Sequence, residues 1–423
     1  MSHINTKCVQ EGWKPKTGEP RVLPIFQSTT FKYDDAKTMG DLFDFNTSGH
    51  FYTRLSNPTL EAVENKISAL EGGIGAMLTA SGQAASTAVI LTICQAGDHV
   101  VSSNSVYGGT FNLFNVTLRR MGVDFTFVSP DASDEEIKGA IKPNTKLVFG
   151  ETLANPALTV LDIERFAKIA HQNDLPFVVD NTFPTAINCR PFEFGADIVV
   201  HSTSKYMDGH AMSLGGVIVD SGRFDWAKSP RHGNMCAPDE SYHGLVFTEK
   251  FGAAAFIAKA RAQIMRDLGA QMSPMNAFLL NVGLETLHLR MPVHCSNAMK
   301  VAEMLSVHPK IAWVTYPGLK GDKYYELAKK YMPHGTSGVI SFGIKGGRAS
   351  AAKFMESTTL AAPVIHVADA RTSILHPAST THRQLTDQQL EECGVTPDLI
   401  RMSVGIEYID DIIDDIKTAL EKC

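Results

Sequence analysis

A lysine and an aspartate stand at the ends of two apolar, β-branched runs in the middle of the chain. Residues 196–201 lead to Lys205, and residues 175–179 lead to Asp180. Such runs are typical of buried parallel strands, and in open α/β sheets ligands gather at the carboxyl ends of the strands. Lysine is costly to bury unless its charge or its amine is used. Lys205 and Asp180 are therefore the first candidates for chemistry.

A lysine and an acid at the ends of two neighbouring strands suit pyridoxal 5'-phosphate (PLP). The lysine would form a Schiff base with the cofactor, and the acid would keep the pyridine nitrogen protonated so that the ring takes up electrons. Two other interpretations remain open from Lys205 and Asp180 alone: a buried ion pair, or a lysine that reaches solvent beyond its strand. The rest of the chain must decide between them.

A phosphate dianion needs N–H and hydroxyl donors, and two segments offer them. Residues 76–86 have the pattern of a strand, a turn and a helix, in which Gly82 permits close approach of the backbone. The N–H groups of Gly82 and Gln83 open the helix, and helix N-termini bind anions. Ser202 and Ser204 are placed to add hydroxyls to the same oxygens. A plain helix cap would explain the Ser-Gly pair equally well.

Four further residues could contact such a cofactor or its substrate. Tyr52 and Arg54 lie in an N-terminal arm, where arginine can grip a phosphate bidentately and tyrosine can donate a hydrogen bond. Tyr107 follows the predicted strand 99–103 and could stack on a planar ring or transfer a proton. Asn155 follows another strand end and could bind a ring oxygen or a carboxylate. Each of them also has an ordinary structural interpretation.

Arg401 lies inside an apolar strand pattern near the C-terminus. A buried arginine needs an anionic partner. The α-carboxylate of an amino-acid substrate would serve, and so would an internal salt bridge.

The totals exclude several classes of protein. The chain has 423 residues, 44% hydrophobic and 20% charged, and a net charge of −6, which gives no basic footprint for nucleic acid. No apolar run approaches the roughly 20 residues of a membrane span, and the N-terminus has no signal-peptide pattern. The seven dispersed cysteines form no C-x-x-C, which favours reduced thiols in the cytoplasm over disulfides or a zinc site. The acidic cluster 410–415 reads as a solvated helix face, so we expect no metal.

The order of elements predicts three parts. Residues 1–60 form an arm that contacts a neighbouring subunit, 61–270 a large PLP-binding domain, and 271–423 a C-terminal α+β domain. Strand–helix alternation between 75 and 220 predicts a largely parallel sheet, with one or two antiparallel strands at an edge. The large domain has strands at 76–79, 99–103, 124–128, 146–150, 176–180, 197–201 and 215–219, and helices at 83–95, 110–121, 133–141 and 162–173. A long helical stretch, punctuated by Pro274 and Pro292, then covers 250–306, and the last part has strands at 311–315, 338–344, 363–367 and 400–404.

In combination and order, the motifs resemble the Cys/Met-metabolism family of PLP enzymes. The resemblance covers nearly the whole chain and rests on seven motifs: Tyr-Thr-Arg-Leu-Ser-Asn-Pro-Thr (52–59), Ala-Ser-Gly-Gln-Ala-Ala (80–85), Val-Tyr-Gly-Gly-Thr (106–110), Val-Asp-Asn-Thr-Phe (179–183), His-Ser-Thr-Ser-Lys-Tyr (201–206), His-Pro-Ala-Ser-Thr-Thr-His (376–382) and Arg-Met-Ser-Val-Gly-Ile-Glu (401–407). It implies the α/β, aspartate-aminotransferase-like fold type I, with a seven-stranded, mostly parallel sheet domain and a small C-terminal domain. It also implies a homotetramer, a dimer of dimers.

The same resemblance implies the role of each candidate residue. Lys205, Asp180 and Tyr107 would be catalytic, as Schiff-base lysine, acid on the pyridinium and tyrosine stacked on the ring. Arg401, Asn155 and Tyr52 would bind the substrate. The cofactor would be held by those three catalytic residues together with Ser81, Gly82, Gln83, Thr182, Ser202 and Ser204, and by Tyr52 and Arg54 of the neighbouring subunit.

Finer features are similar to O-acetylhomoserine sulfhydrylases. Gly109 stands where methionine γ-lyases typically carry cysteine, and the segment 42–51 is also sulfhydrylase-like. We therefore expect γ-replacement, in which O-acetyl-L-homoserine and sulfide or methanethiol give homocysteine or methionine and acetate. Methionine γ-lyase and cystathionine γ-synthase or γ-lyase remain the alternatives. One departure is the segment 366–371, where His366 and Arg371 replace the asparagine and lysine usual in sulfhydrylases.

Overall fold

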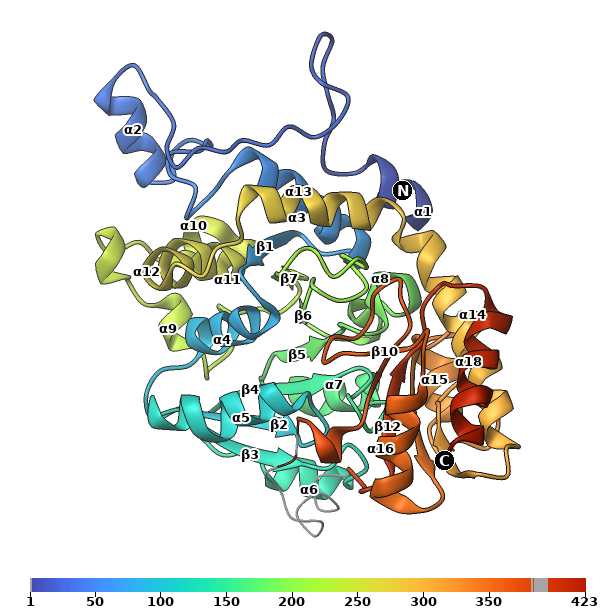
Figure 1. Ribbon diagram of the computed structural model, residues 1–423. Helices are drawn as coiled ribbons and strands as arrows, with labels where there is room; N and C mark the ends of the chain where they lie inside the picture. Colours follow the sequence, from blue (N-terminus) through green and yellow to red (C-terminus); the bar gives the residue numbers. More distant parts are fainter. Residues whose placement is uncertain (1, 382, 384–394) are drawn as a thin grey trace.

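The computed structural model describes residues 2–381, 383 and 395–423, so His382 of the motif 376–382 lies outside the described residues. A seven-stranded sheet forms the centre of the molecule (Figure 1), in the order β1-β7-β6-β5-β4-β2-β3. The strands are β1 (Gly75–Thr79), β2 (His99–Ser103), β3 (Asp124–Val128), β4 (Thr145–Glu151), β5 (Phe177–Asp180), β6 (Ile198–His201) and β7 (Gly216–Asp220). The predicted strands and the predicted α/β class are confirmed.

One strand of this sheet runs against the others. β7 is antiparallel to both of its neighbours, β1 and β6, whereas the pairs from β6 through β5, β4 and β2 to β3 are parallel. The antiparallel strand therefore lies next to the edge, not at the edge as we predicted, because β1 covers its free side. β4, β5 and β6 run in the same direction, so their carboxyl ends lie together at one end of the sheet.

Both faces of the sheet are buried, and the alternation of side chains along each strand divides them between two cores. Val199 belongs to one core, with α3 (Pro58–Glu71) and α7 (Ile163–His171). Ile198 and Val200 belong to the other, with α4 (Gly82–Ile93). Each buried valine or isoleucine stabilises the fold by about 1.5–3 kcal/mol. Since a shift of one residue would exchange the faces, this packing fixes the positions of the strand ends.

The helices of the large domain begin and end at recognisable residues. Asn57 caps α3, Pro58 occupies its first position, and Gly72, at φ 83°, ends it. The predicted helix 110–121 is divided into α5 (Gly108–Asn112) and a π-helical segment, η1 (Leu113–Leu118). The remaining helices between β3 and β7 are α6 (Asp134–Gly139), α7, α8 (Thr185–Asn188) and a 3-10 turn, η2 (Pro191–Phe194).

The stretch 250–306 is not one helix but a series. After α9 (Gly233–Cys236) and η3 (Glu240–Tyr242) come α10 (Phe247–Phe251), η4 (Gly252–Ala254), α11 (Ala255–Lys259), π-helical η5 (Ala260–Met265), α12 (Arg266–Leu268), α13 (Pro274–Glu285) and α14 (Leu287–Ser306). Pro274 starts α13 because a first-turn position needs no N–H donor. Figure 1 shows α13 lying along α3, and α14 leading from there toward the second sheet.

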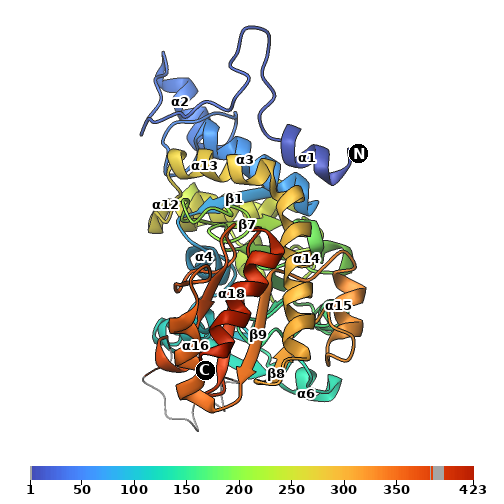
Figure 2. The same ribbon diagram turned by 45° about the vertical axis from the view of Figure 1, so that its right-hand side comes forward.

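The C-terminal part contains a five-stranded sheet in the order β10-β11-β12-β9-β8. α14, α16 (Gly347–Ser357) and α18 (Ile409–Glu421) pack on it (Figure 2), and the other members are β8 (Ile311–Thr315), α15 (Tyr325–Tyr331), β9 (Val339–Ile344), β10 (Ala362–Pro363), β11 (Ser373–Leu375), η6 (Pro377–Ser379) and β12 (Leu399–Ser403). The predicted strand 363–367 is wrong. The strand β10 ends at Pro363, after which the Val364 N–H makes a last bond to the Ile374 carbonyl at 3.3 Å. Its neighbour in the sheet is β11, which is too short to give a sequence pattern.

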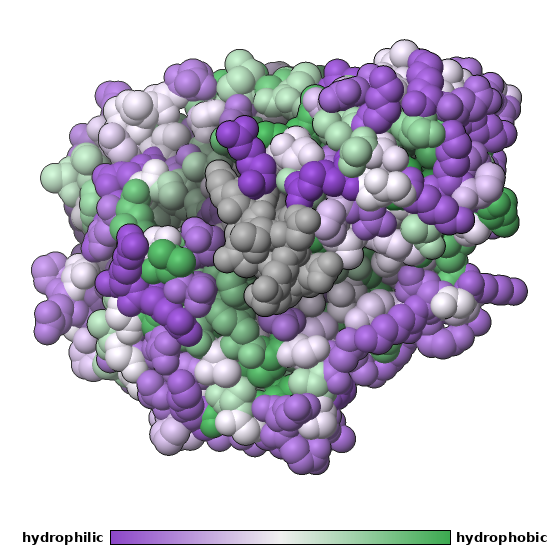
Figure 3. All heavy atoms as spheres, turned by 60° about the horizontal axis from the view of Figure 1, so that its bottom comes forward, coloured by the Kyte–Doolittle hydropathy of each residue, from purple (hydrophilic) through white to green (hydrophobic). Residues whose placement is uncertain are grey.

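The first 57 residues contribute α1 (Ile4–Gln10), α2 (Ala36–Phe43) and extended chain. In Figures 1 and 2 this segment reaches outward beyond α3 and α13, away from the two sheets. On the face drawn in Figure 3, apolar residues lie in scattered groups among hydrophilic ones. Within the described residues, no helix has the length and apolar character that a bilayer crossing requires.

Candidate active site

The carboxyl ends of β4, β5 and β6 bring the first candidates together. Asp180 pairs in register with Glu151 of β4 on one side and with Val200 of β6 on the other. The chain then turns from His201 through Ser202 to Lys205, so that the predicted lysine and acid come from adjacent strands. The two apolar runs therefore correctly predicted that Lys205 and Asp180 follow the carboxyl ends of neighbouring strands.

A threonine fixes the orientation of the Asp180 carboxylate. Oδ1 accepts hydrogen bonds from the Thr182 N–H at 3.0 Å and from the Thr182 hydroxyl at 2.5 Å. The same hydroxyl oxygen accepts the Ser202 N–H at 2.9 Å, which ties the ends of β5 and β6 together. Oδ2 has no hydrogen-bond partner among the described residues. Burial raises the pKa of Asp180, so a cation facing Oδ2, such as a protonated pyridine nitrogen, would relieve the cost of this buried charge.

Lys205 is partly buried and has no acid partner among the described residues. Its nearest polar partner is His366, whose Nδ1 lies 3.5 Å from the Lys205 Nζ. No carboxylate of the described residues lies within 4.0 Å of this amine, which rules out the buried Lys205–Asp180 ion pair. The pKa of Lys205 is lowered to about 8, mainly by burial and to a smaller extent by the nearby Arg401 cation. An amine with this pKa is partly unprotonated near neutral pH and is therefore able to act as a nucleophile or a base.

The turn after β1 forms a close-packed cradle beside β6. A Cβ on Gly82 would lie 2.7 Å from the Ser202 Cβ and 2.9 Å from its Cα, so only glycine permits this approach. Ser81 caps α4, since its Oγ accepts the Ala84 N–H at 3.1 Å. The Gln83 Oε1 is buried without a hydrogen-bond partner within the described part of the chain. The free N-terminus of α4, facing Ser202, suits a phosphate.

Ser204 differs from its neighbour because its hydroxyl is already used. It donates to the Gly215 carbonyl at 3.1 Å and accepts the Gly215 N–H at 2.9 Å. These bonds hold the turn of Lys205 against the start of β7. A phosphate contact from Ser204 would need its single O–H, so the bond to the Gly215 carbonyl would have to be replaced.

A buried glutamate that sequence reasoning missed holds Tyr107. The Glu151 Oε2 accepts the Tyr107 N–H at 2.6 Å. The pKa of Glu151 is raised well above its ordinary value, mainly by burial and to a smaller extent by the Asp180 carboxylate. The Tyr107 ring is 48% exposed, which leaves its face open to a ligand. The available signal was a charged residue ending the apolar run of β4.

Arg401 and Asn155 meet across the two sheets. The Arg401 Nη1 lies 3.4 Å from the Asn155 Oδ1, and Nη2 donates to the Ile365 carbonyl at 2.9 Å. Arg401 is 8% exposed, and burial lowers its pKa to about 10. Among the described residues no carboxylate lies within 4.0 Å of it, so the internal salt bridge is excluded. A buried cation without such a partner is suited to the carboxylate of a ligand.

Tyr52 and Arg54 do not join the other candidates within one chain. The Arg54 guanidinium lies 5.3 Å from the centre of the Tyr52 ring and donates to the Arg266 carbonyl at 2.5 Å. No hydrogen bond or ion pair of the described residues links either one to Lys205 or Asp180. Their place in the outward-reaching arm suits contact with another subunit.

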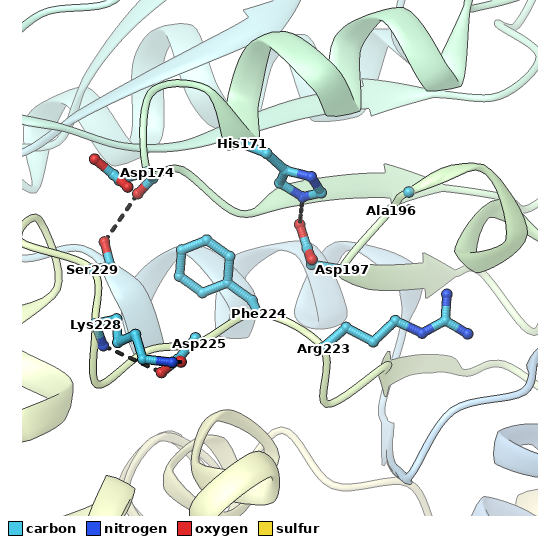
Figure 4. A pocket seen from close by; sticks show the side chains of 10 residues that line it. His171, Asp174, Ala196, Asp197, Arg223, Phe224, Asp225, Lys228 and Ser229 are labelled. Atoms are coloured by element: carbon cyan, nitrogen blue, oxygen red, sulfur yellow. Dashed lines mark hydrogen bonds and ion pairs between the residues drawn. The ribbon is translucent and has the colours of Figure 1, made fainter.

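A hollow of about 270 Å³ lies elsewhere, beside the amino end of β6 (Figure 4). His171 and Asp197 form a hydrogen bond of 2.8 Å at its wall, and Lys228 pairs with Asp225 at 2.7 Å. The polar groups in this hollow thus largely satisfy one another, and it is remote from the strand ends that carry Lys205.

Comparison with known proteins agrees with this geometry. A family model described as Cys/Met metabolism PLP-dependent enzyme matches residues 5–421. The chain belongs to this family. Its PLP dependence is thereby established, and the predicted family and cofactor are confirmed. The residues just described fit the cofactor: a glycine cradle for a phosphate, a partly buried amine, and a carboxylate with one oxygen that no described residue hydrogen-bonds.

Individual relatives are similar over nearly their whole length. The chain is 45% identical to an O-acetyl-L-homoserine sulfhydrylase of Leptospira meyeri, over 98% of this chain and 96% of the relative. It is 42% identical to a homocysteine/cysteine synthase of Kluyveromyces lactis, over 99% and 97%. A crystal structure of a putative O-acetylhomoserine (thiol)-lyase of Campylobacter jejuni superposes with a TM-score of 0.96 at 35% identity, over 99% and 100%. That protein carries N'-pyridoxyl-lysine-5'-monophosphate at its position 205.

Proposed function

We propose that the protein catalyses γ-replacement on O-acetyl-L-homoserine, with sulfide or methanethiol as the entering group, giving L-homocysteine or methionine and acetate. The single observation that carries the proposal is a partly buried Lys205 amine beside a buried Arg401, neither of which has a carboxylate partner among the described residues. The amine is suited to the PLP aldehyde, and the guanidinium is suited to the α-carboxylate of an amino acid. The names of the relatives agree with the predicted reaction.

Each candidate side chain has a task in this proposal. Bound PLP supplies an electron sink for the charge that remains when a proton leaves the substrate. The Lys205 amine removes the proton from Cα, and Asp180 holds the proton on the ring nitrogen. Arg401, with Asn155, binds the α-carboxylate. Tyr107 stacks on the ring, and its phenol or the Lys205 ammonium donates a proton to the departing acetate.

The phosphate is held by residues of the glycine cradle and of the strand ends. Gly82 and Gln83 donate from the start of α4, Ser81 and Thr182 shape the turns, and Ser202 and Ser204 offer hydroxyls. Tyr52 and Arg54 reach the phosphate from the neighbouring subunit, and Tyr52 also faces the substrate. The close Gly82–Ser202 approach beside the N-terminus of α4 supports this assignment.

The assembly that follows is a homotetramer built from two dimers, each with shared sites. Its direct test mixes two inactive variants, Arg54→Ala and Lys205→Ala. Mixed dimers contain one site with both native residues, so mixing should restore activity that neither variant has alone. Sedimentation of the wild type measures the assembly size. If mixing restores no activity, Arg54 serves only its own subunit and is not part of a shared site.

We also place the enzyme in the cytoplasm, which the six unpaired cysteines of the described residues support.

The experiment that tests the reaction offers two substrates to the purified protein. O-acetyl-L-homoserine with sulfide should give homocysteine quickly, and methionine alone should give little 2-oxobutyrate. Fast release of 2-oxobutyrate and ammonia from methionine, with only trivial homocysteine formation, would reverse the assignment in favour of a γ-lyase.

A further inference from the structure

Tyr206, the residue directly after Lys205, joins the large domain to the C-terminal part of the chain. Its side chain is completely buried, and its phenol oxygen accepts the Gly338 N–H at 2.9 Å. The same phenol hydrogen-bonds the Ser403 hydroxyl. Gly338 directly precedes β9 and Ser403 ends β12, so the phenol contacts two neighbouring strands of the second sheet.

The space around this phenol leaves no room for a side chain at position 338. A Cβ on Gly338 would lie 2.7 Å from the Tyr206 oxygen and 2.8 Å from the Val404 carbonyl oxygen. Burial raises the pKa of Tyr206, so the phenol stays neutral and can donate one hydrogen bond while it accepts another. A buried hydroxyl with both bonds made is a fixed link between the two parts of the chain.

The backbone and the ring of Tyr206 are held as firmly as its phenol. The buried Arg290 of α14 donates from Nη1 to the Tyr206 carbonyl at 2.9 Å. The ring makes T-shaped contacts with His294, whose ring centre lies 4.9 Å away, and with Phe183 at 6.4 Å. A movement of this side chain would therefore move the backbone that carries Lys205.

The other end of this link is the strand that carries Arg401. Arg401 and Ser403 are two residues apart in β12, so their side chains lie on the same face of the strand. Both also hold the loop between β10 and β11. The Arg401 Nη2 donates to the Ile365 carbonyl at 2.9 Å, and the Ser403 Oγ accepts the Ala368 N–H at 2.8 Å. The phenol of Tyr206 is thus bonded to the structural unit that orients Arg401.

The reaction under "Proposed function", on which this inference rests, requires a fixed spacing between Lys205 and Arg401. The amino group of the substrate must reach the cofactor at Lys205 while its carboxylate reaches Arg401, and in an α-amino acid a single carbon separates the two groups. Binding groups must be held within about 0.5 Å of their productive geometry. Because the two residues belong to different sheets, their spacing depends on the contacts between these sheets.

We propose that Tyr206 is a positioning residue, which sets the spacing between Lys205 and Arg401 so that one α-amino acid can reach both. It acts through its neighbours: its backbone carries Lys205, and its phenol holds β12. Without the phenol oxygen β12 would lose its hydrogen bond to the turn after Lys205, and a bound substrate would have to restore the spacing from its own binding free energy.

The decisive experiment measures the binding of L-norvaline and of butylamine, which lacks the carboxylate, to the holoenzyme by calorimetric titration. Tyr206→Phe removes only the phenol oxygen. It should weaken norvaline binding about 10-fold, the factor that corresponds to one lost hydrogen bond. Butylamine binding should not change, and neither should PLP affinity in equilibrium dialysis. Ser403→Ala removes the partner of the phenol in β12, so it should act in the same direction and replaces Tyr206→Phe if that variant does not fold.

Tyr331→Phe is the matched control, because the Tyr331 phenol also joins the two parts of the chain. From α15 it accepts the Glu164 N–H at 3.2 Å and hydrogen-bonds Asp162, at the start of α7. Within the described part of the chain, none of its hydrogen bonds reaches the turn of Lys205 or β12. Tyr331→Phe should therefore destabilise the apoprotein in urea, as Tyr206→Phe does, but leave the binding of norvaline and of butylamine unchanged.

A double-mutant cycle shows whether Tyr206 acts through Arg401. In Arg401→Met the substrate carboxylate has lost the group whose position matters. Adding Tyr206→Phe to this variant should therefore change norvaline binding less than about 2-fold. A further loss as large as the one in the wild-type background would overturn the proposal.

The remaining outcomes are distinct. Equal losses for norvaline and butylamine in Tyr206→Phe, or no loss for norvaline, would overturn the positioning role. A wild type that binds norvaline no better than butylamine would overturn the assignment of Arg401 and this inference with it. A wild type that prefers norvaline but makes no homocysteine would overturn the proposed reaction alone, because the binding assays need no turnover.

Discussion

Replacing Arg401 by methionine should have opposite effects on stability and on substrate binding. In the apoprotein the guanidinium is a buried cation without a carboxylate partner among the described residues, and burial lowers its pKa to about 10. A free arginine has a pKa of at least ~12.5, and each factor of ten in proton affinity corresponds to ~1.4 kcal/mol. The buried charge therefore costs the apoprotein about 3 kcal/mol. Methionine fills similar space without this cost, so Arg401→Met should be as stable as the wild type or more stable.

Binding should change in the other direction. Truncating one partner of a buried, hydrogen-bonded charge pair costs about 2–5 kcal/mol, which weakens amino-acid binding about 30-fold to several thousand-fold. The assay compares L-norvaline with butylamine, which lacks the carboxylate, by calorimetric titration. The wild type should prefer norvaline strongly, and Arg401→Met should lose this preference. PLP affinity should change little.

Two results would refute this reasoning. If Arg401→Met loses affinity for PLP and for norvaline to the same extent, the arginine supports the structure of the whole site and does not bind the substrate carboxylate specifically. If the variant apoprotein unfolds several kcal/mol more easily in urea, the hydrogen bonds from Arg401 to Asn155 and Ile365 outweigh the cost of the charge.

Three further changes test other parts of the site. Asp180→Asn should retain covalent PLP but lower turnover at least about 100-fold, and turnover near wild type would mean that no charge is needed at the ring nitrogen. The apoprotein should lose stability as pH rises above 4.5, because the raised pKa of Glu151 makes the native state bind a proton that the unfolded chain releases. Glu151→Gln, which keeps an acceptor for the Tyr107 N–H, should weaken this dependence in urea unfolding, and an unchanged slope would contradict the buried carboxyl as its source. Gly82→Ala should cost about 1–3 kcal/mol of stability and weaken PLP binding in equilibrium dialysis, whereas Gly139→Ala, whose Cβ meets nothing within 4 Å, should do neither.

The sheet was predictable because its strands are continuous apolar runs that end in polar residues. Asp180 and Lys205 follow directly from that pattern. The short strand β11 was missed, because three residues give no periodicity, and the predicted strand 363–367 contributes only its first residue to β10. Local signals mark the breaks in the stretch 250–306, since Gly252 at φ 54° and Gly269 at φ 72° end helices and Pro274 begins α13. Pro292, which we also expected to interrupt the stretch, lies inside α14.

Other features of the site depend on contacts between distant segments. Glu151 reads as one more strand residue until the fold places its carboxyl on the Tyr107 N–H. His366 appeared in the sequence only as a departure from a motif, and only the fold shows that its Nδ1 lies 3.5 Å from the Lys205 Nζ. The absence of an acid near Lys205 and near Arg401, within the described residues, is equally invisible in the sequence.

Reduction of the holoprotein with borohydride, followed by peptide mass spectrometry, tests the central claim most directly. The account predicts a yellow protein whose pyridoxyl group becomes fixed on Lys205, and no trapped cofactor in Lys205→Ala. A colourless holoprotein, or a pyridoxyl group fixed on any other lysine, would contradict it.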